Sequence, residues 1–259
     1  MALWRMPGPL SPAWDTRAVQ LTRFADQLQI PLVRREIPSR HITLILNLGD
    51  PLTLARNDGR TQLGSFATGL QTGPAIIERC GQQAGIHLRM PPTTAYALFG
   101  IPMHLLTGEV MVVAELLGSR TDRLIERLAM AGSRTQAQAA ISAELGSASA
   151  PARQPSAVIA RAWEQLVATR GGVRIDELVR LSGWSHRHLD ARFREQIGLP
   201  PKAVARLLRF EYAAALLRNS RMPLAALAGE AGYYDQAHLN RDFRSLAGCS
   251  PRAYRFTTA

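Results

Sequence analysis

Two short segments, fifty residues apart, carry side chains suited to hydrogen bonding with the edges of nucleic-acid bases. They read SHRHLDARFREQIG (185–198) and DQAHLNRDFRSLAG (235–248). Arginine can bond guanine, glutamine and asparagine can bond adenine, aspartate can accept from cytosine, and alanine can touch a thymine methyl group. The candidates are Arg187, Asp190, Ala191 and Arg194 in the first segment, and Gln236, Ala237, Asn240, Arg241 and Arg244 in the second.

Helical spacing explains why these side chains would face outward. Leu189, Phe193 and Ile197 fall at positions i, i+4 and i+8 of the first segment, and their counterparts fifty residues later are Leu239, Phe243 and Ala247. Such a stripe packs on a neighbouring helix and leaves the opposite face to solvent or a partner. Ser185 and Asp235 are N-cap residues at the two starts. The sequence therefore predicts a duplicated structural unit.

Each segment follows a shorter helix and a glycine turn, the outline of a helix-turn-helix. The first short helix carries Ile175 and Leu178 and ends at Gly183, and the second begins at Pro223 and turns at Gly232. Residues 201–220 form a long helix between the units. Twenty helical residues span about 30 Å, close to the ~34 Å of one DNA turn. We expect the rod to hold two recognition helices in successive major grooves.

The charge distribution favours the same partner. The chain has a formal net charge of +11, and residues 151–259 hold 17 of its 31 lysines and arginines but only 9 of its 20 acidic residues. A solvated helix face is the ordinary interpretation of any single basic residue, and basic balance alone has many causes. The duplication, the charge and the rod together favour double-stranded DNA.

The chain is long enough for two domains, with 46% hydrophobic and 20% charged residues. Its composition changes at GSASAPARQPS (146–156), which is typical of a linker. We predict an α+β protein: a sensor or dimerisation-like β domain with trailing helices at 1–145, a linker at 146–155 and an all-α DNA-binding domain at 156–259. The β domain is a small antiparallel barrel or sandwich, and the α domain holds the two helix-turn-helix units joined by the long helix.

The N-terminal half reads as strands first and helices second. HITLILNLGD (41–50) suits a strand, Asn57, Asp58 and Gly59 suit a hairpin, and PAIIERC and GIHLRM flank a predicted turn at GQQAG (81–85). His87 and Arg89 alternate with apolar residues, which makes them weak candidates for effector binding. TTAYALFG (93–100), EVMVVAELLG (109–118) and TDRLIERLAMAG (121–132) read as helices ending on capping glycines.

The residues for enzymatic or metal chemistry do not gather in recognisable patterns. Cys80 and Cys249 stand far apart, and His41, His87 and His104 stand singly, so we expect no metal site, no cofactor and no catalytic residues. No apolar run reaches the roughly 18 residues of a membrane span, and the N-terminus lacks the apolar core of a secretory signal. We expect a cytoplasmic protein without a membrane partner.

The segment LAALAGEAGYYDQAHLNRDFRSLAGCSPRAYRF (224–256) resembles the C-terminal signature of the AraC/XylS family of bacterial transcription regulators. The residues that carry the resemblance are Ala228, Gly232, Tyr233, Asp235, Phe243, Arg244, Gly248, Ser250, Pro251, Tyr254 and Arg255. The resemblance covers residues 156–257 and implies a seven-helix domain with two helix-turn-helix units on one DNA face. By position, the family's base-reading face falls on Arg187, Asp190, Ala191, Gln236, Ala237, Asn240 and Arg241.

Three positions depart from the pattern of the family. Val179 stands where a small residue is frequent, and Ala191 and Ala237 stand where other members often have a polar reader. Either the second unit or the Arg187 end of the first then carries most of the discrimination. The family also includes DNA-repair relatives whose N-terminal domain holds zinc on four cysteines. The two cysteines of this chain cannot supply such a site.

The N-terminal half is similar to the sensor-like, cupin-like β domains fused to a subset of these regulators. Two roles stay open for it: it binds a small-molecule effector, or it serves only as a dimerisation or protein-interaction module. A homodimer and contact with RNA polymerase are further partners that the resemblance implies. The sequence sets neither the promoter nor the sign of regulation.

Overall fold

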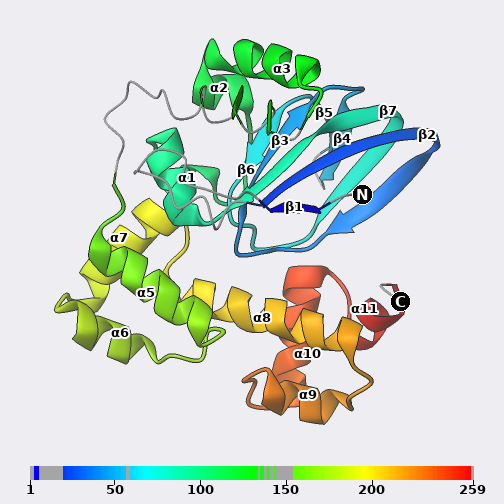
Figure 1. The fold of residues 1–259 in the computed structure, drawn as a ribbon. Helices are drawn as coiled ribbons and strands as arrows, with labels where there is room; N and C mark the ends of the chain where they lie inside the picture. The colour runs from blue at the N-terminus through cyan, green and yellow to red at the C-terminus, as the bar shows by residue number, and fades with distance from the viewer. Residues whose placement is uncertain are drawn as a thin grey trace.

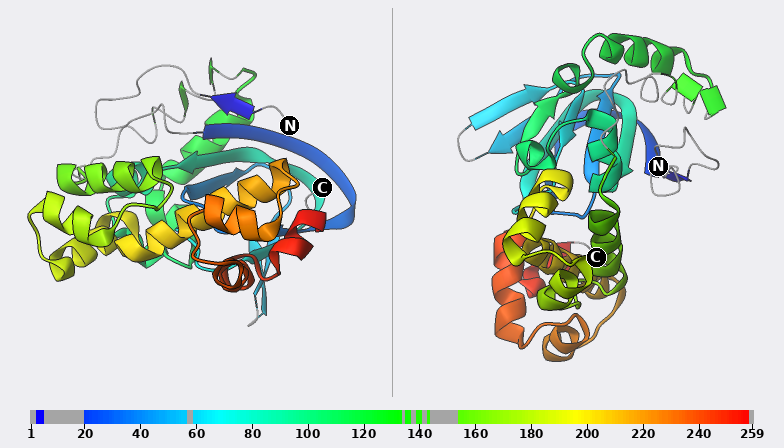
Figure 2. Two further views of the ribbon diagram at one scale, coloured as in Figure 1. Left: turned by 90° about the horizontal axis from the view of Figure 1, so that it is seen from below. Right: turned by 90° about the vertical axis from the view of Figure 1, so that its left-hand side faces the viewer.

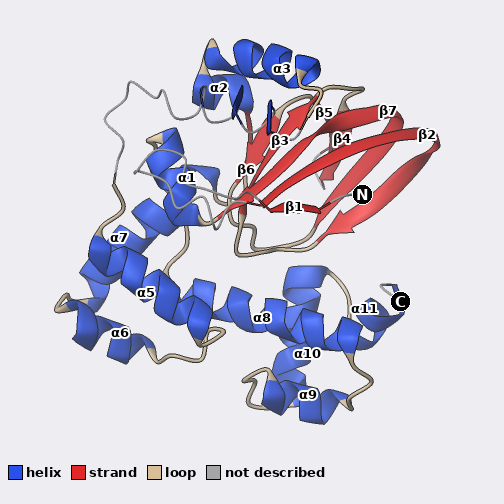
Figure 3. Ribbon diagram, viewed as in Figure 1, coloured by secondary structure: helices blue, strands red, loops and turns tan. Residues whose placement is uncertain are grey.

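The computed structural model describes residues 3–5, 20–56, 59–133, 135–136, 139–140, 143 and 154–257. An antiparallel β barrel lies above a layer of helices, and further helices cover one end of the barrel (Figures 1 and 3). The predicted fold class, a β domain followed by an all-α part, is therefore confirmed. Most of the predicted linker lies outside the described residues, so the domain boundaries stay predictions.

The barrel is one antiparallel sheet organised around its longest pair of strands. Its order is β1-β2-β7-β3-β6-β8, and β4 pairs with both β7 and β5. The strands are β1 (Leu3–Arg5), β2 (Gln20–Glu36), β3 (Ile42–Asn47), β4 (Leu52–Arg56), β5 (Gly59–Leu63), β6 (Phe66–Thr68), β7 (Ala75–Met90) and β8 (Val110–Val112).

The turn predicted at GQQAG is wrong, because β7 runs through these residues without interruption. Gly81 has a φ of 75° and the strand stays paired with β2 on both sides of it. The loop after β3 also bonds to this stretch: Leu48 N–H donates to Ala84 O at 2.7 Å, and Asp50 N–H donates to Gln82 O at 2.7 Å. Long-range pairing thus overrides a local turn preference.

The structure contains strands at the other predicted positions. The expected strand within 41–50 is β3. Strands β4 and β5 pair with Arg56 opposite Gly59, and Asn57 and Asp58 of the predicted hairpin turn lie outside the described residues. The alternation at the end of β7 is confirmed, since Ile86, Leu88 and Met90 are buried. The sequence pattern did not indicate that β2 extends over 17 residues.

Between β7 and residue 131, four helical segments are described, two before β8 and two after it. They are α1 (Pro92–Phe99), the 3₁₀ helix η2 (Met103–Leu106), α2 (Val113–Leu117) and α3 (Arg120–Met130). The helix predicted over 109–118 is wrong in its first part, because Val110–Val112 pair with β6 as β8. Gly100 and Gly118 close α1 and α2 as predicted, but α3 ends at Ala131 and not at Gly132.

Seven helices occupy the described residues 154–257. They are α5 (Ala157–Ala168), α6 (Ile175–Ser182), α7 (His186–Ile197), α8 (Pro201–Asn219), α9 (Leu224–Glu230), α10 (Gln236–Ala247) and α11 (Pro251–Thr257). One continuous cluster of buried side chains joins their core to that of the barrel. A smaller cluster, comprising Phe24, Ile45, Leu52, Leu54, Leu63 and Phe66, lies apart from it inside the barrel.

Adding one methyl group at Gly85 should test the uninterrupted path of β7. A Cβ there would lie 2.5 Å from Leu46 O and 2.8 Å from Phe24 Cζ, so we expect Gly85→Ala to lower the free energy of unfolding by about 1–3 kcal/mol. Denaturant midpoints of the full chain would measure it. Gly64→Ala is the control, because a Cβ at Gly64 meets no described atom within 4 Å. Equal midpoints for both variants would contradict the described packing.

Candidate nucleic-acid interface and interdomain cavity

The first helix-turn-helix unit consists of α6 and α7. Gly183 closes α6 in the left-handed conformation, with a φ of 69°. Ser185 then caps α7, since its hydroxyl accepts from His188 N–H at 3.2 Å. Leu189, Phe193 and Ile197 are fully buried, so the predicted packing stripe fixes which face of α7 points outward.

The second unit repeats this arrangement with α9 and α10. Gly232 supplies the turn with a φ of 76°, and the Asp235 carboxylate accepts from His238 N–H at 2.6 Å. Leu239, Phe243 and Ala247 are fully buried. The fifty-residue repeat in the sequence is therefore a repeat in the fold.

The structure leaves the predicted base-reading residues accessible on both recognition helices. The side chains of Asp190 and Asn240 are half-buried at the edge of each face. The exposed members are Arg187, Ala191 and Arg194 on α7, and Gln236, Ala237, Arg241 and Arg244 on α10. Both helices lie on the same side of α8 in the right-hand view of Figure 2.

Helix α8 fixes the spacing of the two units through polar contacts that sequence reasoning missed. Arg206 Nε lies 2.8 Å from Asp242 Oδ1 on α10, and Arg209 donates to Gly171 O, in the loop before α6, at 3.0 Å. Arginines on a basic helix look like solvent or DNA contacts in a sequence. Only the burial of Asp242, which is 4% exposed, shows that Arg206 serves the fold.

A cavity of about 1170 Å³ lies between the barrel and α8. Its inner end is apolar, formed by Phe24, Ile45, Leu52, Leu54 and Phe66 of the smaller core cluster. Leu208, Ala214 and Ala215 of α8 close the opposite side. Pockets for small molecules typically measure about 300–1,000 Å³ and combine an apolar wall with a few polar groups.

Positive charge dominates the polar part of the lining. Seven arginines and two glutamates contribute to it. They are Arg34, Arg35, Arg40, Arg79, Arg89, Arg170 and Arg218, with Glu36 and Glu211. The arginines come from the barrel, from the loop after α5 and from α8, so both halves of the chain build the basic wall.

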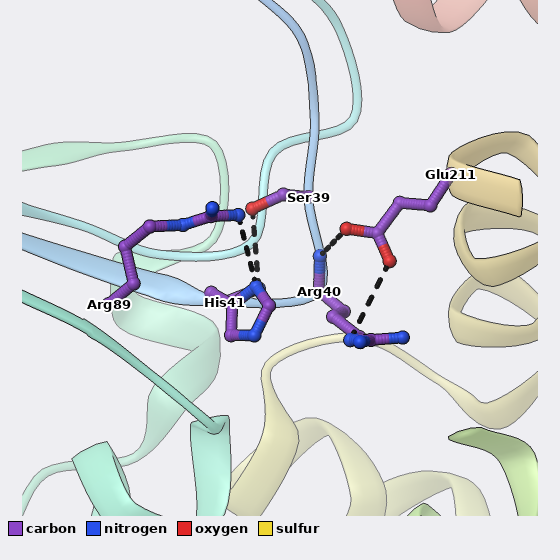
Figure 4. Close-up of polar contacts among 5 residues, drawn as sticks. All are labelled: Ser39, Arg40, His41, Arg89 and Glu211. Atoms are coloured by element: carbon purple, nitrogen blue, oxygen red, sulfur yellow. Dashed lines mark hydrogen bonds and ion pairs between the residues drawn. The ribbon is translucent and has the colours of Figure 1, made fainter. Parts of the chain in front are cut away.

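Both sequence-predicted effector candidates, His87 and Arg89, line this cavity. Arg89 Nη2 lies 3.1 Å from His41 Nδ1 (Figure 4). Burial, then the positive charge of Arg89, lowers the pKa of His87 to about 4. Burial, Arg89 and Arg40 lower the pKa of His41 to about 3. The two imidazoles are therefore neutral at physiological pH and can donate or accept hydrogen bonds.

Glu211 of α8 reaches across the cavity to the barrel. Its Oε1 accepts from Arg40 N–H at 2.9 Å, and its Oε2 lies 3.8 Å from Arg40 Nε (Figure 4). One feature of the sequence could have indicated a role for Glu211, because it is the single carboxylate on the otherwise basic α8. A lone acid in such a helix indicates a specific cation partner.

The remaining sequence predictions concern His104, metal ions and membrane spans. His104 is exposed on η2, away from the cavity lining. Among the described residues, no group of three or more histidines, cysteines and carboxylates could hold a metal ion. In the same part of the chain, none of the helices combines the length and apolar character needed to span a bilayer.

Known proteins resemble the C-terminal part in sequence. A family model described as a helix-turn-helix domain matches residues 178–256. The F1 operon positive regulatory protein of Yersinia pestis is 37% identical over 83 residues, which are 32% of this chain and 28% of that protein. A relative from Streptomyces antibioticus, named as AraC-like, is 33% identical over 81 residues, 31% of this chain and 27% of its own length. The match thus spans under a third of each relative.

Solved structures resemble the whole fold. ToxT from Vibrio cholerae superposes with a TM-score of 0.51 at 8% identity, covering 92% of this chain and 98% of that one. Another ToxT structure, with a TM-score of 0.50 and 9% identity, covers 93% and 100% and is bound to (E)-4-(8-methylnaphthalen-1-yl)but-3-enoic acid. At such identities the similarity concerns the fold alone.

Two capped helix-turn-helix units on one connecting helix, preceded by a β barrel, define a class of two-part helix-turn-helix proteins. Residues 178–256 of this chain form a helix-turn-helix domain of the AraC type, as the C-terminal motif indicated. The individual base-reading residues stay predictions, because their positions on the fold say nothing direct about DNA contacts.

The neutral histidines predict a loss of stability in mild acid. The unfolded chain takes up protons near pH 6.5, whereas folded His87 and His41 do so only near pH 4 and 3. Stability should therefore fall as the pH drops from 6.5 towards 4, by about 1–2 kcal/mol per histidine at pH 5. The raised pKa of Glu211, caused mainly by burial, acts in the opposite sense.

Denaturant unfolding of the full chain between pH 7.5 and 5 would measure this loss. His87→Gln should flatten the pH dependence, and His104→Gln, on the exposed η2, is the matched control. An unchanged slope in His87→Gln would show that His87 is protonated in the folded state.

Proposed function

We propose that this protein is a sequence-specific, DNA-binding transcription regulator whose β domain binds a small-molecule effector. The observation that carries the DNA-binding part is the pair of capped recognition helices, α7 and α10, which lie on the same side of α8 (Figure 2). Nineteen residues give α8 a length of about 28 Å, which suits two successive major grooves about 34 Å apart.

The proposed division of labour between the units follows from side-chain chemistry. Gln236, Asn240 and Arg241 give α10 three polar base readers, while α7 offers Arg187 and Asp190 beside the small Ala191. Arg194 and Arg244 lie one turn further along their helices and suit the phosphate backbone. We therefore assign most of the base discrimination to the second unit and to Arg187.

The cavity supports the effector part of the proposal. Its apolar end and its arginine-rich polar part suit an organic anion, and the neutral imidazoles of His41 and His87 suit hydroxyl or carbonyl groups. One protein of the same fold, ToxT, has an aryl butenoic acid bound. The sequence had left this role open beside a pure interaction module.

One observation supports the alternative role of the β domain as a dimerisation or protein-interaction module. Ile30 and Val33 on β2 are 79% and 58% exposed, which is unusual for large apolar side chains on a strand. A homodimer through the β domain and contact with RNA polymerase therefore stay secondary proposals. An interaction module would respond to protein concentration, whereas an effector site responds to added ligand.

Binding of the full chain to the DNA upstream of its own gene, against a scrambled fragment of equal length, tests the regulator proposal. We expect tight binding to the upstream fragment and a salt dependence with a slope of about −0.9 for each phosphate contact. Equal, salt-sensitive binding to both fragments would mean that charge alone acts and would count against sequence reading at this site.

Replacing Arg241 should alter specificity more than affinity. Once an operator is found, we expect Arg241→Ala to cost about 1–3 kcal/mol at one base position and to relax the preference there. Arg60→Ala removes the same charge from the β4–β5 hairpin, where Arg60 pairs with Glu78, and should leave DNA binding intact. A uniform loss over all base substitutions would instead make Arg241 a phosphate contact.

A thermal-shift screen of the full chain tests the effector proposal. Organic acids with an aromatic or aliphatic body should raise the melting temperature, because a ligand that binds only the folded state stabilises it by mass action. Arg89→Ala should weaken the response, since Arg89 lines the cavity. A melting temperature that depends on protein concentration and on none of the acids would favour the interaction module.

A further inference from the structure

The carboxylate of Glu211 occupies a place in the cavity that an external anion would suit. It comes from α8, yet it is held by the backbone N–H and the guanidinium of Arg40, in the loop between β2 and β3. The positive charges of Arg40, Arg89 and Arg218 all act on it. One carboxylate thus faces several cations, and the surroundings remain positively charged.

The geometry of the Glu211–Arg40 ion pair would allow another anion to replace Glu211. The guanidinium of Arg40 lies 3.8 Å from Glu211 Oε2, and its side chain is 41% exposed against 20% for Glu211. A partly exposed single ion pair contributes little to stability. Burial raises the pKa of Glu211, which shows that its charged form is incompletely compensated there. An acid group with better access to Arg40 and Arg89 could therefore replace it at small cost.

We propose that Glu211 is a tethered anion that joins α8 to the barrel when no effector is bound, and that the acid group of an organic anion displaces it. This inference rests on the effector role proposed for the cavity and adds the mechanism by which the ligand acts. The Glu211–Arg40 pair is the interdomain latch, and effector binding opens it.

The residue after Glu211 links the latch to both helix-turn-helix units. The guanidinium of Arg170, in the loop before α6, lies 4.0 Å from the ring centre of Tyr212. The hydroxyl of Tyr212 donates to Glu230 Oε1 on α9 at 2.7 Å. A movement of α8 at Glu211 therefore acts on the first unit through Arg170 and on the second through Glu230.

Arg170 carries a further mark of a functional position. It lines the cavity, and among the described residues it is the one non-glycine residue with a positive φ, 53°. Such a backbone conformation is strained and is kept where the surroundings impose it. Its guanidinium stacks on Tyr212 and its N–H donates to Val167 O at 3.1 Å, so a strained residue is held in contact with α8 at the cavity wall.

Other interdomain contacts lie outside the latch and would keep the two parts attached when it opens. Thr107 Oγ1 donates to Gly198 O, at the end of α7, at 2.9 Å. The Tyr96 hydroxyl donates to Glu195 Oε1 at 3.1 Å. Opening the latch would thus free the α8 side while the α7 end stays in place, which changes the presentation of α10 relative to α7.

Neutralising Glu211 in the full chain tests the latch. The probes are 1-naphthaleneacetate, benzoate and octanoate, each paired with the corresponding uncharged alcohol, with binding measured by calorimetry. We expect Glu211→Gln to bind at least one acid about tenfold more tightly than the unmodified protein, because the internal competitor has lost its charge. The alcohols should bind both proteins equally.

Thr107→Val is the matched control, because it removes an interdomain hydrogen bond away from the cavity. It should leave the affinity for the acids unchanged. A tighter affinity in both variants would show that loosening the interface, and not removing a competing charge, is responsible, and would overturn the proposal. Equal acid affinity in Glu211→Gln and the unmodified protein, including no binding to either, would overturn it too.

Amide hydrogen exchange gives a second readout. The Arg40 N–H, which Glu211 accepts, should exchange faster in Glu211→Ala and in the acid-saturated unmodified protein. An Arg40 amide as protected with the acid as without it would contradict displacement. Operator binding measured in parallel separates the two hypotheses. If the protein binds its operator specifically but Glu211→Gln does not change acid affinity, only the latch is rejected. If it shows no specific operator binding, the regulator proposal is rejected.

Discussion

Most of the architecture depends on the rigidity of a single helix, α8. One face of it packs against the second helix-turn-helix unit, where the ring centres of Phe210 and Phe243 lie 4.9 Å apart, and Arg209 donates to Gly171 O in the loop before the first unit. Another face closes the cavity beneath the barrel. The hydrogen bonds of a continuous helix of nineteen residues resist bending, so a change at its cavity face is transmitted along the helix. The spacing of the recognition helices and the state of the cavity are therefore mechanically connected.

The β barrel contacts the recognition helices at their C-terminal ends, away from most of the predicted base-reading residues. η2 contacts the end of α7 through Thr107, and Arg35 of β2 lies 3.4 Å from Ala247 O at the end of α10. The N-terminal halves, capped by Ser185 and Asp235, stay accessible. This division lets one domain influence the geometry of the other without covering its reading surface, which a regulator needs if the ligand is to tune binding.

The helical part could be predicted from the sequence because its signals are local. Caps, turn glycines and i, i+4 stripes lie within a few residues of the structure they specify, and Ser185, Gly232 and Phe243 each took the expected role. The barrel depends on long-range pairing, so the turn predicted at GQQAG was wrong and the length of β2 went unseen. The cavity could not be predicted from the sequence for the same reason, because residues from β2, β7 and α8 form it. Only His87 and Arg89 could be picked out, by their alternation along one strand.

Why would α8 keep an acid at Glu211 when every other charge on it is basic? A neutral residue would avoid the cost of burying a carboxylate, and burial does penalise its charged form. Its benefit lies in the unliganded state, in which seven lining arginines would otherwise repel one another across the gap between the domains. Glu211 neutralises part of that charge from the opposite wall and so reduces the repulsion between the arginines. In the mechanism proposed above, the same imbalance would draw an external anion, so cohesion without ligand and affinity for ligand would share one electrostatic cause and compete for the same cations.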